Sequence, residues 1–329
     1  MEPVRWGVMG CARIAVNHLI PAMIQAEGAV VQAIASRTLA KAQDTAKRFG
    51  IARAYGSYEE LLADPDLEAI YIPLPNHLHK PWSIAAVRAG KHVLCEKPIA
   101  LNAEEARDMQ AAREETGRYL LEAFAPRFGP VIQTARDIIA SGQLGELRTI
   151  YTTLTFAITP DPSNVRLQAD IGGGALYDVG CYALNHQLML AGRHPRRAWA
   201  TLEWSPRFHV DMSGAGVLDY GEGLYGTFDM GFTAHGGSYL RVVGSKGKLE
   251  SPHGTGSRDR EDPLLVTVGS STERIVLPPA NTYVLEVQDM CEAIRGLHPP
   301  KFGDEPLDAT MRMLDACYAS DKSGRAEPV

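Results

Sequence analysis

The chain has 329 residues, 45% of them hydrophobic, and its 33 Lys and Arg against 39 Asp and Glu give a net charge of −6. This length is typical of two domains, and the interspersed charges argue against a nucleic-acid-binding surface, which needs clustered basic residues. No apolar run approaches the roughly 18–20 residues that span a bilayer, so no membrane contact is expected. The first residues enter a strand pattern at once and leave no room for a signal peptide, and the five cysteines show neither disulfide nor zinc-site spacing. We therefore expect a cytoplasmic protein with reduced thiols and no metal site.

Short apolar runs alternate with helical patterns over the first 125 residues. Strands are expected at 5–9, 30–35, 69–73, 92–95 and 119–122, and helices at 12–26, 41–49, 58–63, 81–89 and 103–116. Strands separated by helices of this length form right-handed βαβ units with parallel strands. The pattern predicts a dinucleotide-binding Rossmann domain over residues 1–125.

The pattern changes after residue 125. Helices are expected at 131–140, 175–190, 283–296 and 307–320, strands at 148–156, 215–220, 224–230 and 239–243, and a Gly/Ser/Asp-rich surface loop at 253–262. Many strand-like runs without a long helix between them favour a largely antiparallel, open-faced sheet with helices on one face. The predicted fold is thus α/β plus α+β, with residues 126–329 forming a second domain for substrate binding and oligomerisation.

A degenerate glycine loop follows the first strand. Residues 10–15, GCARIA, fit Gly-x-Gly-x-x-Gly/Ala with Ala12 in place of the second glycine. Gly10 permits a tight turn, Ala15 is small enough for close helix–strand packing, and the free amides of a helix N-terminus favour a phosphate. Ala12 weakens the match because its methyl group faces the pyrophosphate, and an ordinary tight βα turn is the alternative.

The end of the second strand indicates which nucleotide is preferred. NAD-binding proteins carry an acidic residue about 20 positions after the glycines, where it binds the ribose 2′-hydroxyl. Here no carboxylate occurs between Glu27 and Asp44, and the strand runs into Ser36 and Arg37, with Lys41 one turn later. These side chains suit a 2′-phosphate, so we predict NADP over NAD, the alternative being that Arg37 is a solvated loop residue.

Two further segments carry reactive side chains. Lys97 follows the strand at 92–95, at the carboxyl end of the parallel sheet, where ligands bind. A lysine there can polarise an oxygen and lower the pKa of a neighbouring phenol, although such a lysine is more often a solvated charge. In the helix at 175–190, Asp178, Tyr182 and Asn185 fall in one polar stripe of an otherwise apolar surface. Such a stripe is either the wall of a site or a row of groups satisfied by backbone and water.

Taken together, these segments resemble the glucose–fructose oxidoreductase/inositol dehydrogenase (Gfo/Idh/MocA) family over essentially the full chain. The resemblance rests on four motifs in order: the glycine loop, PNHLH at 75–79, EKP at 96–98 and GGGALYDVGCY at 172–182. The ARIA start and the Asp178…Tyr182 pair are most similar to the NADP-dependent D-xylose and dihydrodiol dehydrogenase branch.

The resemblance implies roles for individual residues. Lys97 and Tyr182 would be catalytic, with Tyr182 as the general acid/base, and Asp178 would orient the substrate or a catalytic side chain. The residues expected to contact NADP, with NAD as the alternative, are Gly10, Ala12, Arg13, Ile14, Ser36, Arg37, Lys41, Asn76, His79, Glu96 and Lys97. Those expected to contact substrate are Arg166, Asp178, Tyr182, Asn185 and His186.

Two local points accompany these roles. The resemblance suggests a cis bond between Lys97 and Pro98. Relatives often carry an aromatic residue and a histidine around Arg127, where this chain has Pro126 and Gly129. The substrate contacts of that loop are therefore left open.

The sequence thus predicts an NADP-preferring oxidoreductase that transfers a hydride between nicotinamide and a hydroxyl-bearing carbon of a sugar, polyol or vicinal diol. The alternatives are a redox-cycling glycosidase that keeps its nicotinamide bound and a non-catalytic dinucleotide-binding regulator. The expected partner is a small carbohydrate or diol. The resemblance also implies a homodimer or homotetramer formed through the open face of the second sheet.

Overall fold

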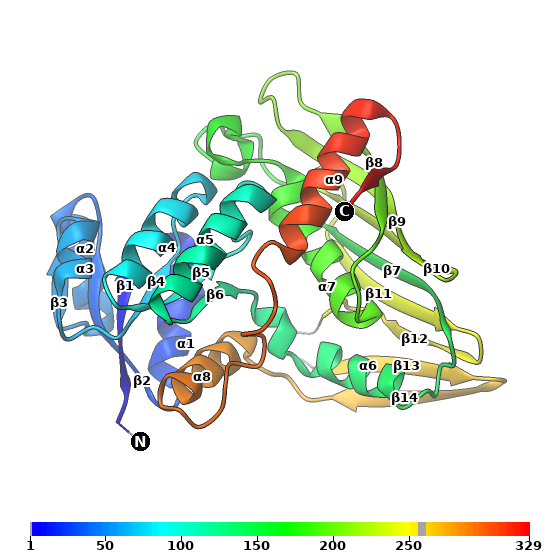
Figure 1. Ribbon diagram of the computed structural model, residues 1–329, viewed down its shortest axis with the longest axis horizontal. Helices are drawn as coiled ribbons and strands as arrows, with labels where there is room; N and C mark the ends of the chain where they lie inside the picture. The colour runs from blue at the N-terminus through cyan, green and yellow to red at the C-terminus, as the bar shows by residue number, and fades with distance from the viewer. Residues whose placement is uncertain (1, 256–260) are drawn as a thin grey trace. The chain divides into compact units, whose positions relative to one another are not determined.

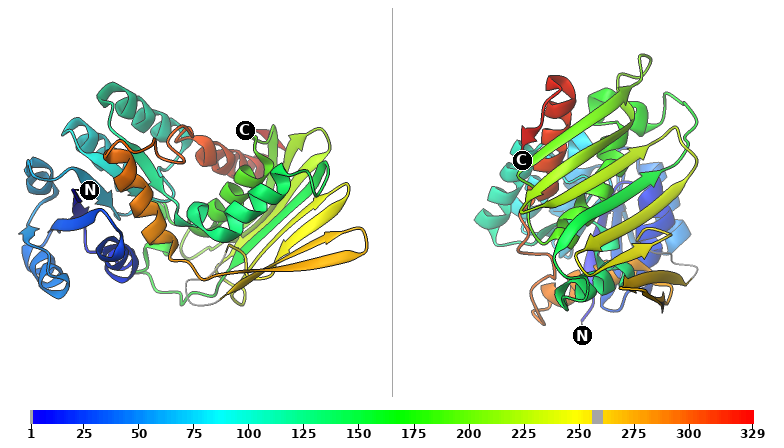
Figure 2. Two further views of the ribbon diagram at one scale, coloured as in Figure 1. Left: turned by 90° about the horizontal axis from the view of Figure 1, so that it is seen from below. Right: turned by 90° about the vertical axis from the view of Figure 1, so that its right-hand side faces the viewer.

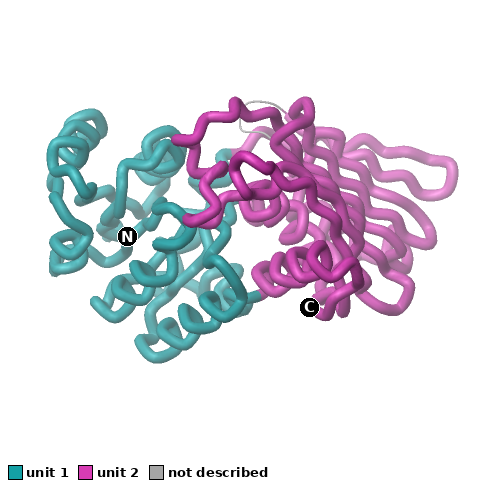
Figure 3. The backbone as a smooth tube through the Cα atoms, turned by 90° about the horizontal axis from the view of Figure 1, so that it is seen from above, with its two compact units in different colours: residues 1–125, 281–308 teal, residues 126–280, 309–329 magenta. Residues whose placement is uncertain are grey.

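The computed structural model describes residues 2–255 and 261–329, which form two compact units. Unit 1 comprises residues 1–125 and 281–308, and unit 2 comprises residues 126–280 and 309–329 (Figure 3). Within the described residues, no helix is both long and apolar enough to cross a membrane. Half of the surface loop expected at 253–262, residues 256–260, lies outside the described residues.

Unit 1 is built on a six-stranded parallel sheet with strand order β3-β2-β1-β4-β5-β6 (Figure 1). Its strands are β1 (Val4–Met9), β2 (Ala29–Ala35), β3 (Arg53–Tyr55), β4 (Ala69–Ile72), β5 (His92–Glu96) and β6 (Leu120–Ala123). Its α-helices are α1 (Ile20–Gln25), α2 (Leu39–Phe49), α3 (Tyr58–Ala63), α4 (His79–Arg88), α5 (Ala103–Thr116) and α8 (Thr282–Ile294). This is the order of a Rossmann fold, so the predicted parallel sheet is confirmed. The three residues of β3 were too few to give a pattern, and that strand was not predicted.

Local sequence explains why these elements form. Every residue of β4 is buried, as expected for a strand covered by helices on both faces. The side chains of Ser57 and Asn102 accept hydrogen bonds from the amides of Glu60 and Glu105 and so cap the first turns of α3 and α5.

One helix of unit 1 comes from far along the chain. We expected the whole segment 126–329 to form the second domain, but α8 lies with unit 1. It buries Val287 and Cys291 in the same core as Trp6, and the Trp6 indole donates a hydrogen bond to Cys291 Sγ at 3.4 Å. The physical reason is that α8 presents an apolar face that fits the core of unit 1, and an amphipathic pattern does not say which core it will meet.

Unit 2 is a nine-stranded sheet with strand order β14-β13-β12-β11-β7-β10-β9-β8-β15. Its strands are β7 (Leu147–Thr155), β8 (Arg197–Trp204), β9 (Asp211–Gly221), β10 (Leu224–Gly231), β11 (Gly237–Gly244), β12 (Gly247–Ser251), β13 (Asp262–Val268), β14 (Ser271–Leu277) and β15 (Glu327–Pro328). All neighbouring strands are antiparallel except β7 and β10, which are parallel. The largely antiparallel sheet is therefore confirmed.

Helices cover one face of this sheet. They are α6 (Pro130–Ala140), α7 (Cys181–Ala191) and α9 (Ala309–Ser323), and Figure 2 shows the opposite face without helices. Along β8 the small apolar residues Ala198 and Ala200 are buried beneath α9, while Trp199 between them is exposed. This alternation is typical of a sheet with one covered face.

Candidate active site

The glycine loop in unit 1 has the backbone of a phosphate cradle. Gly10 has a φ of +125°, a conformation that favours glycine, and a Cβ at this position would lie only 3.2 Å from Leu74 Cδ2. A π-helical turn at Ala15–Leu19 follows the loop and continues directly into α1. This helical segment starts with the bond from Val16 N–H to Ala12 O, so the amides of residues 13–15 have no partner within it. Ala15 is fully buried, as close packing of helix and strand requires. The loop therefore suits a pyrophosphate.

Side chains at the end of β2 and on α3 are placed toward this loop. Ser36 and Arg37 follow β2, with Ser36 nearly buried and Arg37 exposed. Tyr58, which the sequence analysis missed, points its hydroxyl toward the loop, 4.0 Å from where a Cβ of Gly10 would lie. Burial raises the pKa of Tyr58, and the charge of Arg37 opposes that shift, which places Arg37 and Tyr58 in one electrostatic environment. Only the folded position of α3 could have revealed Tyr58.

The Lys97 turn begins where β5 ends. The Lys97–Pro98 bond is cis, and Lys97 is partly exposed. Glu96 is nearly buried, and the Tyr71 hydroxyl donates to its carboxylate at 2.6 Å. His79, expected to contact the cofactor, is instead fully buried beside the turn.

In unit 2 a buried carboxylate holds the start of a helical segment, in which a π-helical turn at Leu176–Gly180 carries Asp178 and continues directly into α7, which carries Tyr182. Asp211 accepts hydrogen bonds from the Leu176 amide at 2.6 Å and from the Tyr318 hydroxyl at 2.9 Å. Gly174 has a φ of +127°, and a Cβ there would lie 2.2 Å from an Asp211 oxygen. The glycines of the GGGA motif thus let a carboxylate reach the helix N-terminus, where negative charge is favourable. Asp211 itself carried no signal in the sequence.

The structure brings together two residues that the sequence assigned to substrate binding. Arg166 Nε donates to Asp178 Oδ2 at 2.6 Å, and the two side chains are 40% and 18% exposed. The Arg166 guanidinium also lies over the Phe156 ring, 5.8 Å from its centroid. Asp178 is therefore an oriented carboxylate at the edge of the helix.

Asn185 occupies a different environment from the one predicted. Its side chain is fully buried, accepts from Arg127 Nε at 3.2 Å and donates to Thr310 Oγ1 at 3.0 Å. Both ends of the amide are therefore engaged in tying α7 to Arg127 and α9. The structure thus gives Asn185 a packing role in place of the predicted substrate contact, because it faces the interior one turn after Tyr182.

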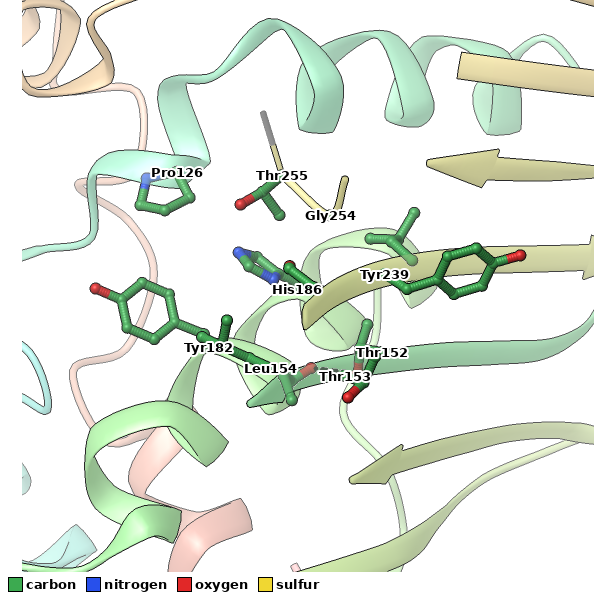
Figure 4. A pocket seen from close by; sticks show the side chains of 12 residues that line it. Pro126, Thr152, Thr153, Leu154, Tyr182, His186, Tyr239, Gly254 and Thr255 are labelled. Carbon is green, nitrogen blue, oxygen red and sulfur yellow. Dashed lines mark hydrogen bonds between the residues drawn. The ribbon is translucent and has the colours of Figure 1, made fainter. Parts of the chain in front are cut away.

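Unit 2 contains a pocket of about 100 Å³ next to α7 (Figure 4). Tyr182 and His186 of α7 line it, with the Tyr182 ring at one end and Tyr239 at the other. The other lining residues are Pro126, Thr152, Thr153, Leu154, Ala183, Ser238, Leu240, Gly254 and Thr255. Burial, with the charge of Arg127, lowers the pKa of His186 to about 3, so the ring is neutral at physiological pH. The described lining thus offers hydroxyl groups and a neutral imidazole, which suit a polar, uncharged ligand.

Across the described residues, no group of three or more His, Cys, Asp or Glu side chains is placed to hold a metal ion. His77 lies in a 3₁₀ turn at Asn76–Leu78 and His79 is the first residue of α4, with both ring nitrogens of His79 facing backbone carbonyls.

Both units match models of known families. Residues 4–124 match a family described as oxidoreductases with an NAD-binding Rossmann fold, and residues 132–250 match the Gfo/Idh/MocA C-terminal domain. The chain belongs to the Gfo/Idh/MocA family. The predicted family is therefore confirmed, and so is a nicotinamide dinucleotide as the cofactor.

Proteins with named activities are similar over three quarters of the chain or more. A D-xylose 1-dehydrogenase (NADP+) of Haloferax volcanii is 35% identical, covering 98% of both chains. A trans-1,2-dihydrobenzene-1,2-diol dehydrogenase of Mus musculus is 32% identical, covering 75% of this chain and 74% of its own. Among solved structures, a 3-ketoreductase of Actinomadura kijaniata in complex with NADP and TDP-benzene superposes with a TM-score of 0.90 at 29% identity, covering 97% and 98% of the two chains.

Proposed function

We propose that this member of the Gfo/Idh/MocA family is an NADP-preferring oxidoreductase that acts on a CH–OH group of a sugar, polyol or vicinal diol. One observation carries the proposal: a continuous helical segment of unit 2, the π-helical turn Leu176–Gly180 and α7 directly after it, bears both the oriented carboxylate, Asp178, and the pocket tyrosine, Tyr182. A phenol can exchange a proton with a hydroxyl group, and a carboxylate can accept hydrogen bonds from neighbouring hydroxyls. The similar D-xylose and dihydrodiol dehydrogenases agree with such a substrate.

The residues of unit 1 fit a nicotinamide dinucleotide. The positive φ of Gly10 and the amides of residues 13–15 would hold its pyrophosphate, and Ser36, Arg37 and Lys41 would hold the 2′-phosphate. Asn76 and Glu96 would border the nicotinamide ribose. The cofactor, when bound, supplies the acceptor or donor of the hydride.

The chain's own residues then move the proton and fix the substrate. We propose that Tyr182 removes the hydroxyl proton during oxidation and returns it during reduction. The ammonium of Lys97 polarises the reacting oxygen and favours the deprotonated phenol. Asp178, held by Arg166, accepts hydrogen bonds from a neighbouring hydroxyl of the substrate. His186 stays neutral, so it contributes hydrogen bonds and no charge.

The test is the absorbance change at 340 nm with NADP or NAD and a panel of aldoses, inositols and aromatic dihydrodiols. We expect NADPH formation with at least one of these classes. No absorbance change with any compound of the panel, from protein that still binds NADP, would contradict the proposal. Nucleotide that stays bound through purification would then favour a redox-cycling glycosidase.

Replacing Arg37 with Ala should weaken NADP binding by more than tenfold and leave NAD binding unchanged. The reason is that a charge-assisted contact to a phosphate contributes about 1.5–3 kcal/mol, which the 2′-hydroxyl of NAD does not require. Titration of both nucleotides by quenching of tryptophan fluorescence measures this, with Arg48→Ala, an exposed arginine at the far end of α2, as the matched control. Full NADP affinity in Arg37→Ala would overturn the NADP assignment.

We also propose that copies of the chain pair through the open face of the unit 2 sheet. Trp199, Val217 and Tyr225 on this face are 41%, 38% and 48% exposed, and burying such residues stabilises an association.

One edge of the sheet is closed to strand addition, because Ser320 and Asp321 of α9 accept hydrogen bonds from amides of β8. Light scattering should show a dimer or tetramer at micromolar concentration and a shift toward monomer in Trp199→Glu; a monomeric wild type would contradict pairing.

We place the protein in the cytoplasm, in agreement with its five free cysteines. Fractionation of the cells that express it tests this.

A further inference from the structure

The backbone around Lys97 is unusually enclosed for a turn at the end of a strand. In the stretch 93–100 every residue is buried except Lys97, which is partly exposed. A turn normally lies at the surface, because its backbone polar groups need water or another partner. Here side chains of the protein bond to the backbone groups of the turn. The Lys97 side chain is therefore carried by a backbone that is fixed both before and after it.

On the N-terminal side the fixed point is Glu96. The hydroxyl of Tyr71, from the neighbouring strand β4, donates to Glu96 Oε1 at 2.6 Å, and the Lys97 amide donates to Glu96 Oε2 at 3.3 Å. Tyr71 is fully buried, and burial, together with the nearby Glu96 carboxylate, raises the pKa of its phenol, so it acts as a donor at every physiological pH. One carboxylate therefore links β4 to the backbone of Lys97 itself.

On the C-terminal side the fixed point is Pro98. The two ring nitrogens of His79 lie 2.8 Å from the carbonyl oxygen of Pro98 and 2.7 Å from that of Leu74. Both oxygens only accept, and burial lowers the pKa of His79 to about 4, with a smaller contribution from the charge of Lys97. The neutral ring has one N–H and donates to one of the two carbonyls at a time, without having to move. His79 thus connects the Lys97 turn to the loop that follows β4.

We propose that Tyr71 and His79 are positioning residues for Lys97: together they hold the backbone on both sides of it, and neither contacts the cofactor or the substrate. Both side chains are fully buried, which is why they cannot reach a ligand directly. A buried polar group is costly unless it keeps its hydrogen-bond partner, so each of these side chains resists any displacement of the turn that would break its bond.

The direct test observes Lys97 itself and requires no turnover. Lysines of the full-length protein are labelled by reductive methylation with ¹³C-formaldehyde, and the Lys97 resonance is assigned by its loss in Lys97→Met. We expect this resonance to shift or broaden in Tyr71→Phe, which keeps the volume of the ring, and in His79→Gln. In His79→Gln the amide nitrogen replaces Nε2 and keeps the Leu74 contact while losing the Pro98 contact.

Two matched variants separate positioning from a general loss of stability. His79→Asn places an amide nitrogen at the position of Nδ1, keeps the Pro98 contact, and should restore most of the Lys97 signal. His92, at the other end of β5, also bonds a backbone group and also has a pKa lowered to about 4 by burial, so His92→Asn should leave the Lys97 resonance unchanged. An unmoved resonance in both Tyr71→Phe and His79→Gln, in folded protein, overturns the inference.

The functional consequence rests on the proposed role of Lys97 and is tested separately by a double-mutant cycle. Tyr71→Phe and His79→Gln should each lower kcat at least tenfold with the Kd for NADP unchanged, and should have no further effect in the Lys97→Met background. Additive losses in that background would show that the two residues act elsewhere. If Lys97→Met alone kept full activity, the proposed function would fail, while the resonance test would still decide whether Tyr71 and His79 position Lys97.

Discussion

Substituting Phe for Tyr182 or Met for Lys97 should lower kcat by about 10²–10⁴-fold, the range that a positioned general acid or base typically contributes. Tyr182→Phe removes only the hydroxyl of a residue that lines the pocket and leaves its ring, whose centroid lies 6.1 Å from that of the His186 ring. Lys97→Met removes the ammonium charge at a position that is partly exposed, unlike the other residues of 93–100. Neither change creates a cavity, so the losses should come from the lost proton transfer and polarisation.

The measurement is steady-state NADPH formation at saturating substrate, with NADP affinity determined independently. A drop in kcat together with an unchanged Kd for NADP would place both residues in the chemical step, whereas a change confined to KM would indicate substrate binding alone. Tyr220→Phe serves as the control because Tyr220 is a buried tyrosine of the same unit, on β9 and outside the pocket lining. Near-normal kcat in both Tyr182→Phe and Lys97→Met would refute the mechanism.

The sequence predicted most of unit 1 because its signals are local. Alternation of short apolar runs and helices is enough to specify a parallel sheet, and the turn after β1 requires a glycine whose φ is positive, as Gly10 has. The GGGA motif was equally visible in the sequence, but the structural requirement for glycine at position 174 was not. Asp211, which leaves no room for a Cβ on Gly174, lies 37 residues later in the chain. A motif can therefore be recognised from a short stretch of sequence, while the side chains that require it can lie far away in the chain.

The parts that could not be predicted depend on which surfaces meet. Helix α8 shows the same kind of apolar face as α9, yet one packs in unit 1 and the other in unit 2. Similarly, Tyr182 and Asn185 share a polar stripe in the sequence, but a turn of the helix separates a pocket residue from one that is fully buried between Arg127 and Thr310. Helical periodicity shows on which face of the helix a side chain lies, but it does not show which part of the protein packs against that face.

Lowering the pH from 7 to 5 should destabilise the protein strongly, because three of its histidines are held neutral. Burial lowers the pKa of His79 and of His92 to about 4 and that of His186 to about 3. In the unfolded chain each would titrate near 6.5, so below that pH the unfolded state binds protons that the folded state cannot. The free energy of unfolding therefore falls as the pH falls from 6.5 toward 4. For each of the fully buried residues His79 and His186 the loss at pH 5 is about 2 kcal/mol, large against a total of roughly 5–15 kcal/mol.

Urea unfolding of the wild type and of His186→Gln at pH 7 and pH 5 tests this pH dependence. Burial raises the pKa of Asp211, which acts in the opposite direction, so the informative quantity is the difference between wild type and variant rather than the slope of either alone. Glutamine does not titrate, and the gap between the two proteins should narrow by about 2 kcal/mol on acidification, even if the variant is less stable at pH 7. A gap that stayed constant would mean that His186 is protonated in the folded protein. The pocket would then carry a positive charge below pH 6.5, and Tyr182 would no longer be the only proton donor on that helix for the reduction of a carbonyl.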